Sequence, residues 1–423
     1  MTREMKDSGI PWIGEIPEGW GIDTIGNLYT LRTEKVSDKD YAPLSVTKMG
    51  IVPQLETAAK TDDGDNRKLV RVGDFAINSR SDRRGSCGIS AYDGSVSLIN
   101  LVLTPRGQMY PRFYNWLFHT ELFADEFYKW GHGIVDDLWT TRWQEMKRIS
   151  IVSPSYQEQQ RIAEFLDRKC AEVDEMIALQ EQIIEELKAY KQSVITEAVT
   201  KGLNPAAPMR DSGIEWIGSI PEHWEVKRLK QVLSSPLQYG ANESGMPYQE
   251  NLPRYVRITD ILDNSLRDNI EKQSLTEQQA DGYILQHNDI LFARSGGTVG
   301  KSFIFNEKYG KCAFAGYLIK ASVNELMDAK FVYYFTQTNC YEEWKKQIFI
   351  QSTIQNIGAD RYSQLQLPIP PTYEQQAIAD YLDEKCADID SLIQTKQSKN
   401  DSLKEYKKSI IYEYVTGKRE VNE

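Results

Sequence analysis

Two stretches of the chain carry apolar residues at alternating spacings of three and four, the pattern of a coiled-coil helix. They lie within residues 154–203 and 372–423. The apolar positions are Leu166, Cys170, Val173, Ile177, Ile184, Leu187, Val194 and Ala198 in the first, and Leu382, Cys386, Ile389, Ile393, Leu403, Ile410 and Tyr414 in the second. About 45 residues in each lack Gly and Pro, which predicts two rods of about 65 Å. Polar residues interrupt the seams at Gln180, Lys191, Lys396, Asn400 and Lys407 and are expected to fix the register.

The two helical stretches are copies of each other. The run "EQQRIAEFLDRKCAEVDEMI" (158–177) returns as "EQQAIADYLDEKCADIDSLI" (374–393), a shift of 216 residues that still holds at the ends of the helices. Neither copy needs an insertion, although loops elsewhere in the repeat differ in length. This constancy indicates rods whose length matters.

The segments around the helices predict mixed α/β domains, because short strand-like runs with turn residues precede an amphipathic helix and a closing strand. The expected boundaries are a domain at 1–153, a helix at 154–203, a domain at 204–371 and a helix at 372–423. A parallel pairing of the rods would need a long return connection, so we expect an antiparallel pair. The predicted fold is α+β: two mixed α/β domains separated by two long antiparallel coiled-coil helices, with pseudo-two-fold symmetry.

A short motif stands before each domain. "DSGIPWIGEIPEGW" (7–20) and "DSGIEWIGSIPEHW" (211–224) match at 11 of 14 positions. The motif contains no nucleophile, base or metal set, and its Trp, Ile, Gly and Pro residues suit an apolar clasp between helix and domain. We therefore expect Trp12 and Trp216 to be buried in equivalent environments, and the C-terminal "VTGKR" to lie beside the first copy.

Composition narrows the class of protein. Five Cys without paired spacing and four scattered His predict no disulfide framework, metal or cofactor. The sequence contains no run of about 20 apolar residues that could span a membrane. We therefore expect a cytoplasmic protein without a membrane partner. The net charge is −11, yet residues 21–153 hold 17 acidic and 17 basic residues, and 225–371 hold 16 of each. The excess acid lies in the helices and short repeats, so DNA binding by the neutral domains is not excluded.

Taken together, the doubled "DSGI-x-WIG-x-IPE-x-W", the "EQQ-x-IA-(E/D)-(F/Y)-LD-x-KC" that opens each helix and "DILFARSGGTVGK" resemble the specificity subunits of type I restriction-modification systems over nearly the whole chain. The resemblance implies two target-recognition domains, each of which reads one half of a split site on double-stranded DNA, and helices that set the gap. It also implies a non-catalytic protein that docks two methyltransferase (modification) subunits and, in the full complex, ATP-dependent restriction subunits.

One loop in each domain is a candidate DNA contact. Both begin Arg-Ser and continue into glycine-rich sequence, "SRSDRRGSCGIS" (79–90) and "ARSGGTVGKS" (293–302). Arg suits guanine, and Ser or Thr suits phosphate or a base edge. The candidates are Arg80, Ser81, Arg83, Arg84 and Ser86 in the first domain and Arg294, Ser295, Thr298 and Lys301 in the second. The alternative is a solvated turn with an Asp82–Arg ion pair.

A second loop precedes each closing strand, at 132–144 and 349–361, and mixes polar side chains with Gly. The candidates there are Thr140, Thr141 and Arg142 in the first domain and Gln351, Ser352, Thr353, Gln355, Asn356 and Arg361 in the second. Contact with DNA and a purely structural role are equally good interpretations of these loops.

Catalytic interpretations find little support. "SGGTVGKS" (295–302) misses the first Gly of a phosphate-binding P-loop and continues as a strand, whereas a P-loop opens a helix. The sequence lacks a methyltransferase [ND]PP[FYW] loop, and Cys170 and Cys386 lie on the helical seams, where they are expected to be buried apolar residues. The main rival to a DNA reader is a scaffold whose duplicated domains bind only proteins.

Overall fold

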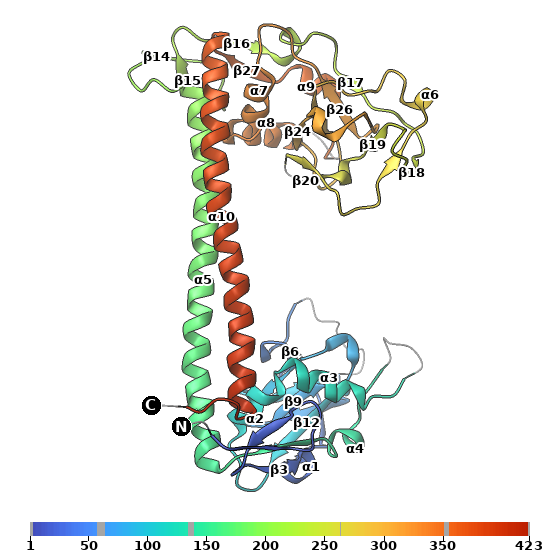
Figure 1. Cartoon of the computed structure of the whole chain (residues 1–423), viewed down its shortest axis with the longest axis vertical. Helices are drawn as coiled ribbons and strands as arrows, with labels where there is room; N and C mark the ends of the chain where they lie inside the picture. The colour runs from blue at the N-terminus through green and yellow to red at the C-terminus, as the bar shows by residue number, and fades with distance from the viewer. Residues whose placement is uncertain (1–2, 57–63, 134–138, 263, 351–354, 422–423) are drawn as a thin grey trace. The chain divides into compact units, whose positions relative to one another are not determined.

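The computed structural model describes residues 3–421 except 57–63, 134–138, 263 and 351–354. They form two compact units (Figure 1). Unit 1 comprises Met1–Glu181 and Ser398–Glu423, and unit 2 comprises Gln182–Gln397. Each unit therefore contains one α/β domain and a part of each long helix. None of the helices in the described ranges is long and apolar enough to cross a membrane.

The domain of unit 1 is built around a four-stranded antiparallel sheet with the order β10-β9-β12-β4. Its strands are β1 (Met5–Asp7), β2 (Glu15–Pro17), β3 (Gly21–Thr24), β4 (Tyr29–Leu31), β5 (Lys35–Val36), β6 (Leu44–Thr47), β7 (Gly50–Pro53), β8 (Arg67–Val70), β9 (Phe75–Asn78), β10 (Cys87–Ile89), β11 (Gly94–Val96), β12 (Asn100–Pro105) and β13 (Ser150–Ser153). Its helices are α1 (Ile25–Leu28), α2 (Pro111–Phe118), α3 (Glu121–Lys129) and α4 (Trp143–Met146).

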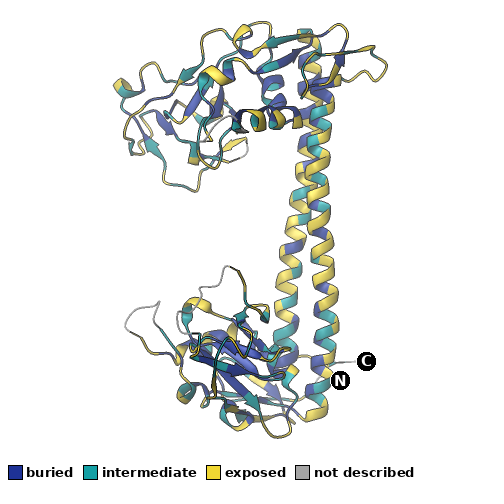
Figure 2. Ribbon diagram, turned by 180° about the vertical axis from the view of Figure 1, so that it is seen from behind, coloured by how far each residue is buried: buried dark blue, intermediate teal, exposed yellow. Residues whose placement is uncertain are grey.

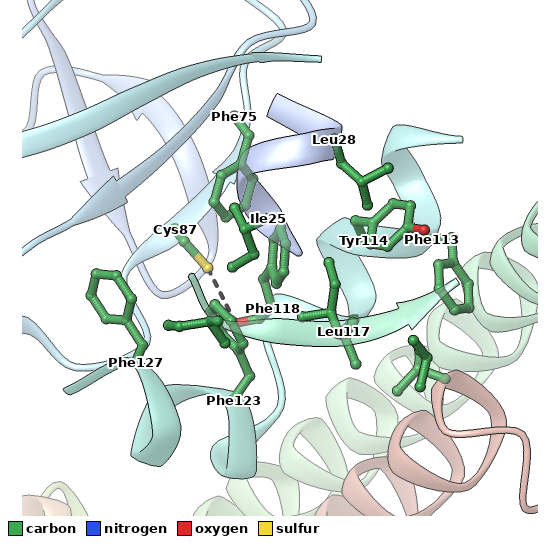
Figure 3. Close-up of a cluster of buried hydrophobic side chains, with 14 of the residues drawn as sticks. Ile25, Leu28, Phe75, Cys87, Phe113, Tyr114, Leu117, Phe118, Phe123 and Phe127 are labelled. Carbon is green, nitrogen blue, oxygen red and sulfur yellow. Dashed lines mark hydrogen bonds between the residues drawn. The ribbon is translucent and has the colours of Figure 1, made fainter. Parts of the chain in front are cut away.

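Both faces of this sheet are buried, because successive side chains of a strand point to opposite faces. Phe75 of β9 packs with aromatic residues of α2 and α3 (Figure 3), and its ring centroid lies 5.0 Å from that of Phe118. Ala76, the next residue, belongs to a second cluster with Leu44 and Val96 on the other face. The strand that leads into the first candidate loop is therefore rigidly held.

The domain of unit 2 repeats this arrangement. The order β24-β23-β26-β17 matches β10-β9-β12-β4 strand for strand. Its strands are β14 (Met209–Asp211), β15 (Ser219–Pro221), β16 (Glu225–Arg228), β17 (Gln238–Tyr239), β18 (Met246–Pro247), β19 (Arg254–Val256), β20 (Ile261–Leu262), β21 (Ser265–Leu266), β22 (Gln273–Ser274), β23 (Ile290–Ala293), β24 (Ser302–Ile304), β25 (Cys312–Phe314), β26 (Leu318–Ala321) and β27 (Gln366–Ile369). Its helices are α6 (Glu277–Ala280), α7 (Ala329–Phe335), α8 (Asn339–Ile350) and α9 (Ala359–Ser363). In each domain the first strand after the clasp pairs with the closing strand, β3 with β13 and β16 with β27.

The predicted long helices are present as α5 (Tyr156–Lys201) and α10 (Thr372–Val415). Within unit 1 the beginning of α5 pairs with the end of α10, where Lys407 Nζ lies 2.6 Å from an Asp174 oxygen. Within unit 2 the repeat places Lys191 Nζ 2.6 Å from Asp390. The pairing is therefore antiparallel in both units, as predicted. Figure 2 shows the buried seam positions recurring along both helices.

Two polar seam residues, Gln180 and Asn400, are buried with a side-chain oxygen that has no hydrogen-bond partner among the described residues. Asn400 is buried, and its Oδ1 accepts no hydrogen bond from the described residues. Such a residue lowers stability while it specifies register. The equivalent position of α5 is occupied by the buried Ile184.

We expect Asn400→Ile to raise the free energy of unfolding of unit 1 by about 1–2 kcal/mol, because it removes an unsatisfied buried amide oxygen. Urea unfolding of the full chain measures this. The reciprocal variant Ile184→Asn serves as the control and should be destabilised. A loss of stability in Asn400→Ile would show that Asn400 has a partner that matters.

A buried glutamine joins each long helix to its domain. Gln159 Nε2 donates to the Pro154 carbonyl at 2.8 Å, while its Oε1 accepts from the Tyr110 amide before α2. Gln375 does the same with the Pro370 carbonyl and with the Asp328 amide before α7. These bonds explain the "EQQ" that opens each helix, since a buried side-chain amide is retained only where it is satisfied.

The doubled motif forms a clasp at the exit of each helix. Residues 7–20 form the first clasp and residues 211–224 the second. Gly417, just after α10, has φ +74°, and a Cβ there would lie 2.9 Å from the Trp20 ring. Gly202, just after α5, has the same φ and lies against Trp224. The C-terminal segment therefore lies beside the first clasp, as expected, and Lys418 Nζ donates to the Ile13 carbonyl at 2.7 Å.

The tryptophans differ from the expectation in one respect. Trp12 and Trp216 occupy equivalent positions but are only partly buried. The fully buried ring of each clasp is the last residue of the motif, Trp20 or Trp224. Each closes over a helix exit, which only a glycine without a Cβ permits.

Candidate DNA interface

In unit 1 the fold brings the two candidate loops together. The first loop, 79–86, connects β9 to β10 and contains a short 3₁₀ turn, Ser81–Arg83. Arg80 forms an antiparallel backbone bridge with Thr140 of the second loop. The Ser81 amide also donates to the Trp139 carbonyl at 3.1 Å. Two segments sixty residues apart on the chain therefore form one surface.

The cationic side chains of this surface differ in their freedom. Arg83 is 70% exposed, and among the described residues its ion pair is a 3.7 Å contact with Asp82. Arg84 pairs with Asp125 of α3. Arg80 is partly buried, and Arg142 is exposed at the start of α4. The predicted Asp82–Arg pair thus exists, but it is long and exposed, so it leaves Arg83 available to a ligand.

Two predicted contacts in unit 1 have other roles in the structure. Thr141 is fully buried, and its Oγ1 donates to the Phe127 carbonyl at 2.8 Å. Ser86 is also buried, and its amide donates to the Arg83 carbonyl at 3.0 Å. Neither side chain has surface to offer DNA in this conformation. We therefore remove both residues from the set of candidate DNA contacts, because they are buried and stabilise the loops.

Unit 2 has the same geometry. The first loop leaves β23 and returns as β24, and Ser295 forms an antiparallel backbone bridge with Asn356 of the second loop. The Ile357 amide donates to the Arg294 carbonyl at 2.9 Å, as the Thr141 amide donates to the Ser79 carbonyl at 3.0 Å in unit 1. The strand β24 begins at Ser302, so the P-loop-like sequence opens no helix, as the sequence predicts.

Arg294 is the best positioned cation of this surface. Its guanidinium lies 4.9 Å from the centroid of the Tyr239 ring, and its Nε has no hydrogen-bond partner among the described residues. The Tyr239 hydroxyl accepts from the Ala359 amide at 2.9 Å, which fixes the ring. Stacking on an anchored ring holds the guanidinium in one orientation.

The remaining candidates of unit 2 belong to the same two loops as Arg294 and Asn356. Lys301 and Arg361 are exposed, and Ser295, Thr298 and Asn356 are partly buried. Gln351, Ser352 and Thr353 lie outside the described residues.

The structure shows which residues of the two first loops are equivalent, and the two Arg-Ser pairs are not at equivalent positions. Asp74 and Asp289 immediately precede β9 and β23 and accept equivalent backbone bonds, from the Arg71 amide at 2.9 Å and the Gln286 amide at 2.7 Å. Counting from them, Arg80 corresponds to Ser295, and Ser79 to Arg294. The bridges agree, since Thr140 and Asn356 are 216 residues apart. The Arg-Ser pairs are therefore shifted by one residue, and the arginines occupy different positions of the two surfaces.

The cysteines are packing residues. All five are buried, and those on the seams, Cys170 and Cys386, are surrounded by apolar side chains. Burial raises the pKa of both thiols to about 11. They are therefore protonated and poor nucleophiles at neutral pH. Within the described ranges no group of His, Cys, Asp and Glu could hold a metal ion.

Comparisons with known proteins agree with this architecture. Residues 221–418 match the family described as the type I restriction modification DNA specificity domain. The chain is 25% identical over 288 residues to the type I restriction enzyme MjaVIII specificity subunit of Methanocaldococcus jannaschii; this match covers 64% of the chain and spans 62% of that protein. It is 23% identical to the putative type I restriction enzyme MjaX specificity subunit of the same organism, over 96% of this chain and 95% of the relative.

Solved structures show the same fold. A chain from a structure of the complex assembly and conformational transition of the type I R-M system gives a TM-score of 0.73 at 15% identity, and the match covers 95% of this chain and 98% of that chain. The HsdS subunit of Thermoanaerobacter tengcongensis gives 0.53 at 16% identity, over 96% of this chain and 98% of its own. Two mixed domains alternating with two paired helices thus define a duplicated, specificity-subunit-like architecture. Over nearly its whole length the chain is thus similar to type I restriction enzyme specificity subunits, and residues 221–418 match their DNA specificity domain.

Proposed function

We propose that this chain reads a bipartite DNA site for a type I restriction-modification complex, each domain reading one half. The observation that carries the proposal is the recurrence of one two-loop surface in both domains, joined by equivalent backbone bridges and carrying different polar side chains. A rigid frame with variable side chains suits two readers of different half-sites.

The proposed contacts are the exposed or partly buried polar residues of these surfaces. They are Arg80, Ser81, Arg83, Arg84, Thr140 and Arg142 in unit 1 and Arg294, Ser295, Thr298, Lys301, Asn356 and Arg361 in unit 2. The predicted contacts Gln351, Ser352 and Thr353 also stay in the set. Arg donors suit guanine, Asn suits adenine, and Ser, Thr and Lys suit phosphates or base edges.

We further propose that the helices set the gap between the half-sites and dock two methyltransferase subunits. Their acidic surface would repel DNA, whereas each unit exposes an apolar pair on them. In unit 1, Met176 and Tyr406 lie at the level of the Lys407–Asp174 ion pair. In unit 2 the equivalent pair, Leu392 and Tyr190, lies at the level of Lys191–Asp390. Two equal patches favour two copies of one partner.

The remaining parts of the proposal follow from the same role. The chain itself contributes no catalysis; the methyltransferase subunits and, in the full complex, ATP-dependent restriction subunits supply it. It acts in the cytoplasm, where its target DNA lies.

Co-purification with the methyltransferase and a gel-shift titration test the proposed role as a DNA reader. We expect the complex to shift one duplex sequence selectively, and equal binding to every duplex would support a scaffold instead.

The apolar pairs give a separate prediction about the number of partners. Met176→Glu and Leu392→Glu should each reduce the methyltransferase content of the complex from two copies to one, and the double variant should lose both, because a buried charge opposes docking. Native mass spectrometry measures the copies. Leu262→Glu changes an equally exposed apolar residue outside the helices and should retain both. Two copies in every variant would place the docking surface elsewhere.

A further inference from the structure

Unit 1 contains a pocket beside its two-loop surface, and the predicted DNA contacts assign no role to this pocket. The pocket has a volume of about 310 Å³. Its lining residues come from β8, the first loop, the approach to β12 and the second loop: Lys68, Ser79, Arg80, Leu98, Ile99, Leu101, Thr140, Thr141 and Arg142. Three of them are cationic, and among the described lining residues there is no carboxylate. A concave site with three positive charges has the chemistry of an anion-binding site.

Lys68 is the least expected of these residues, since it stands on β8, well before the loops. Its Nζ donates to the Asn100 carbonyl at 2.7 Å, which holds the ammonium in place. It is partly buried, and its cross-strand neighbour is Lys35 of β5. Burial, and secondly the Lys35 charge, lower the pKa of Lys68. An ammonium held near a second cation, in a pocket whose described lining has no carboxylate, is stabilised by a bound anion.

The matching positions of unit 2 show that the fold does not require these charges. Leu69 pairs with Ser95 in unit 1, and Ile284 bridges Ala313 in unit 2, so Lys68 corresponds to Tyr283. By the bridge positions, Arg80 corresponds to Ser295, and Arg142 to Gly358. None of the three cations recurs. The same backbone arrangement therefore forms with and without the basic residues. The three charges are not needed for folding.

We propose that this pocket binds a backbone phosphate of the DNA half-site read by unit 1, with Lys68 as an additional contact residue. The inference rests on the proposed function and deepens it. The loops bring base-reading side chains to the groove, while Lys68, Arg80 and Arg142 surround one phosphate, and Leu98 and Leu101 form an apolar wall for the adjoining sugar. Phosphate contacts of this kind position a protein on DNA without reading bases. Unit 2 holds its half-site without these three cations.

The test uses the full chain and a duplex that carries its site, with affinity measured by fluorescence anisotropy at several salt concentrations. Lys68→Tyr introduces the residue that unit 2 has at this position. We expect affinity to fall about 5–10-fold, with base preference unchanged and the slope of log K against log [salt] reduced by about one, as for one lost phosphate contact. Lys68→Arg should restore the slope. Lys188→Tyr removes an exposed charge from α5 and should leave the slope unchanged.

The outcomes separate this inference from the proposed function. A wild-type chain that does not prefer its site over a scrambled duplex would overturn the proposed function. A selective wild type whose Lys68→Tyr variant keeps the same affinity and slope would overturn the pocket alone. Inorganic phosphate provides the last comparison. If it raises the melting temperature of the wild type but not of Lys68→Tyr, while the DNA slope is unchanged, the pocket belongs to a free phosphate ligand and the proposal is wrong.

Discussion

Arg294→Ala is expected to weaken binding to the full DNA site by about 5–150-fold, which corresponds to the ~1–3 kcal/mol of one bidentate base contact. The guanidinium is held over the Tyr239 ring at 4.9 Å, so little entropy is lost when it binds a base. The loss should appear as relaxed base preference in one half-site only. Competition titrations with duplexes altered in either half-site measure this.

Arg83→Ala should have the same effect on the other half-site, because Arg83 is the most exposed arginine of the unit 1 loop. Among the described residues it must release only a 3.7 Å ion pair to bind DNA. Lys346→Ala is the matched control, since Lys346 is exposed on α8 and pairs with Glu343 there. It should leave the preference of both half-sites intact. Unchanged affinity in both arginine variants would refute the assignment of these loops.

Gly417→Val is expected to lower the free energy of unfolding of unit 1 by about 2–5 kcal/mol. A β-branched residue at φ +74° costs about 1–2 kcal/mol, and overpacking adds about 1–3 kcal/mol. The overpacking arises because a Cβ at this position would lie 2.4 Å from Pro17 Cδ and 2.9 Å from the Trp20 ring. Both groups belong to the first clasp and are buried, so neither can move aside cheaply.

Two other glycines provide graded controls for this prediction. Gly9 has φ +67°, and a Cβ there would meet no atom of the described residues within 4 Å, so Gly9→Val tests the backbone cost alone. A Cβ at Gly202 would lie 3.1 Å from Trp224, so this position should be intermediate. Urea unfolding should rank the losses as Gly417 above Gly202 above Gly9. Equal losses for Gly417→Val and Gly9→Val would mean that the clasp contributes nothing to stability.

The long helices and their antiparallel pairing could be predicted because a period of 3.5 residues and a fixed repeat are properties of the sequence itself. The position of Leu166 or Leu382 in the seam follows from spacing alone, and both are fully buried. The presence of two similar domains could also be predicted from the repeat. The strand order of their sheets could not be predicted, because pairings such as β23 with β26 join strands that are distant in sequence.

The candidate site was predicted only in part, for a similar reason. Arg-rich and Gly-rich composition located the loops, but the bridge between Arg80 and Thr140 is a tertiary contact that no local pattern encodes. The hydroxyl of Thr141 makes it a candidate in the sequence, yet that hydroxyl satisfies a buried carbonyl. Lys68 was missed because it joins the site only through the β5-β8-β11 sheet. The duplicated "EQQ" was the one signal for Gln159, and its role required the carbonyl and amide that it bonds.

The central claim, that each domain reads one half of a split site, is tested most directly by mapping methylated bases in the genome of cells that express the chain with its methyltransferase. We predict a single motif with two specified blocks separated by a fixed number of unspecified bases. Arg83→Ala should relax one block, and Arg294→Ala the other. An unbroken motif, or methylation that does not depend on this chain, would contradict the account.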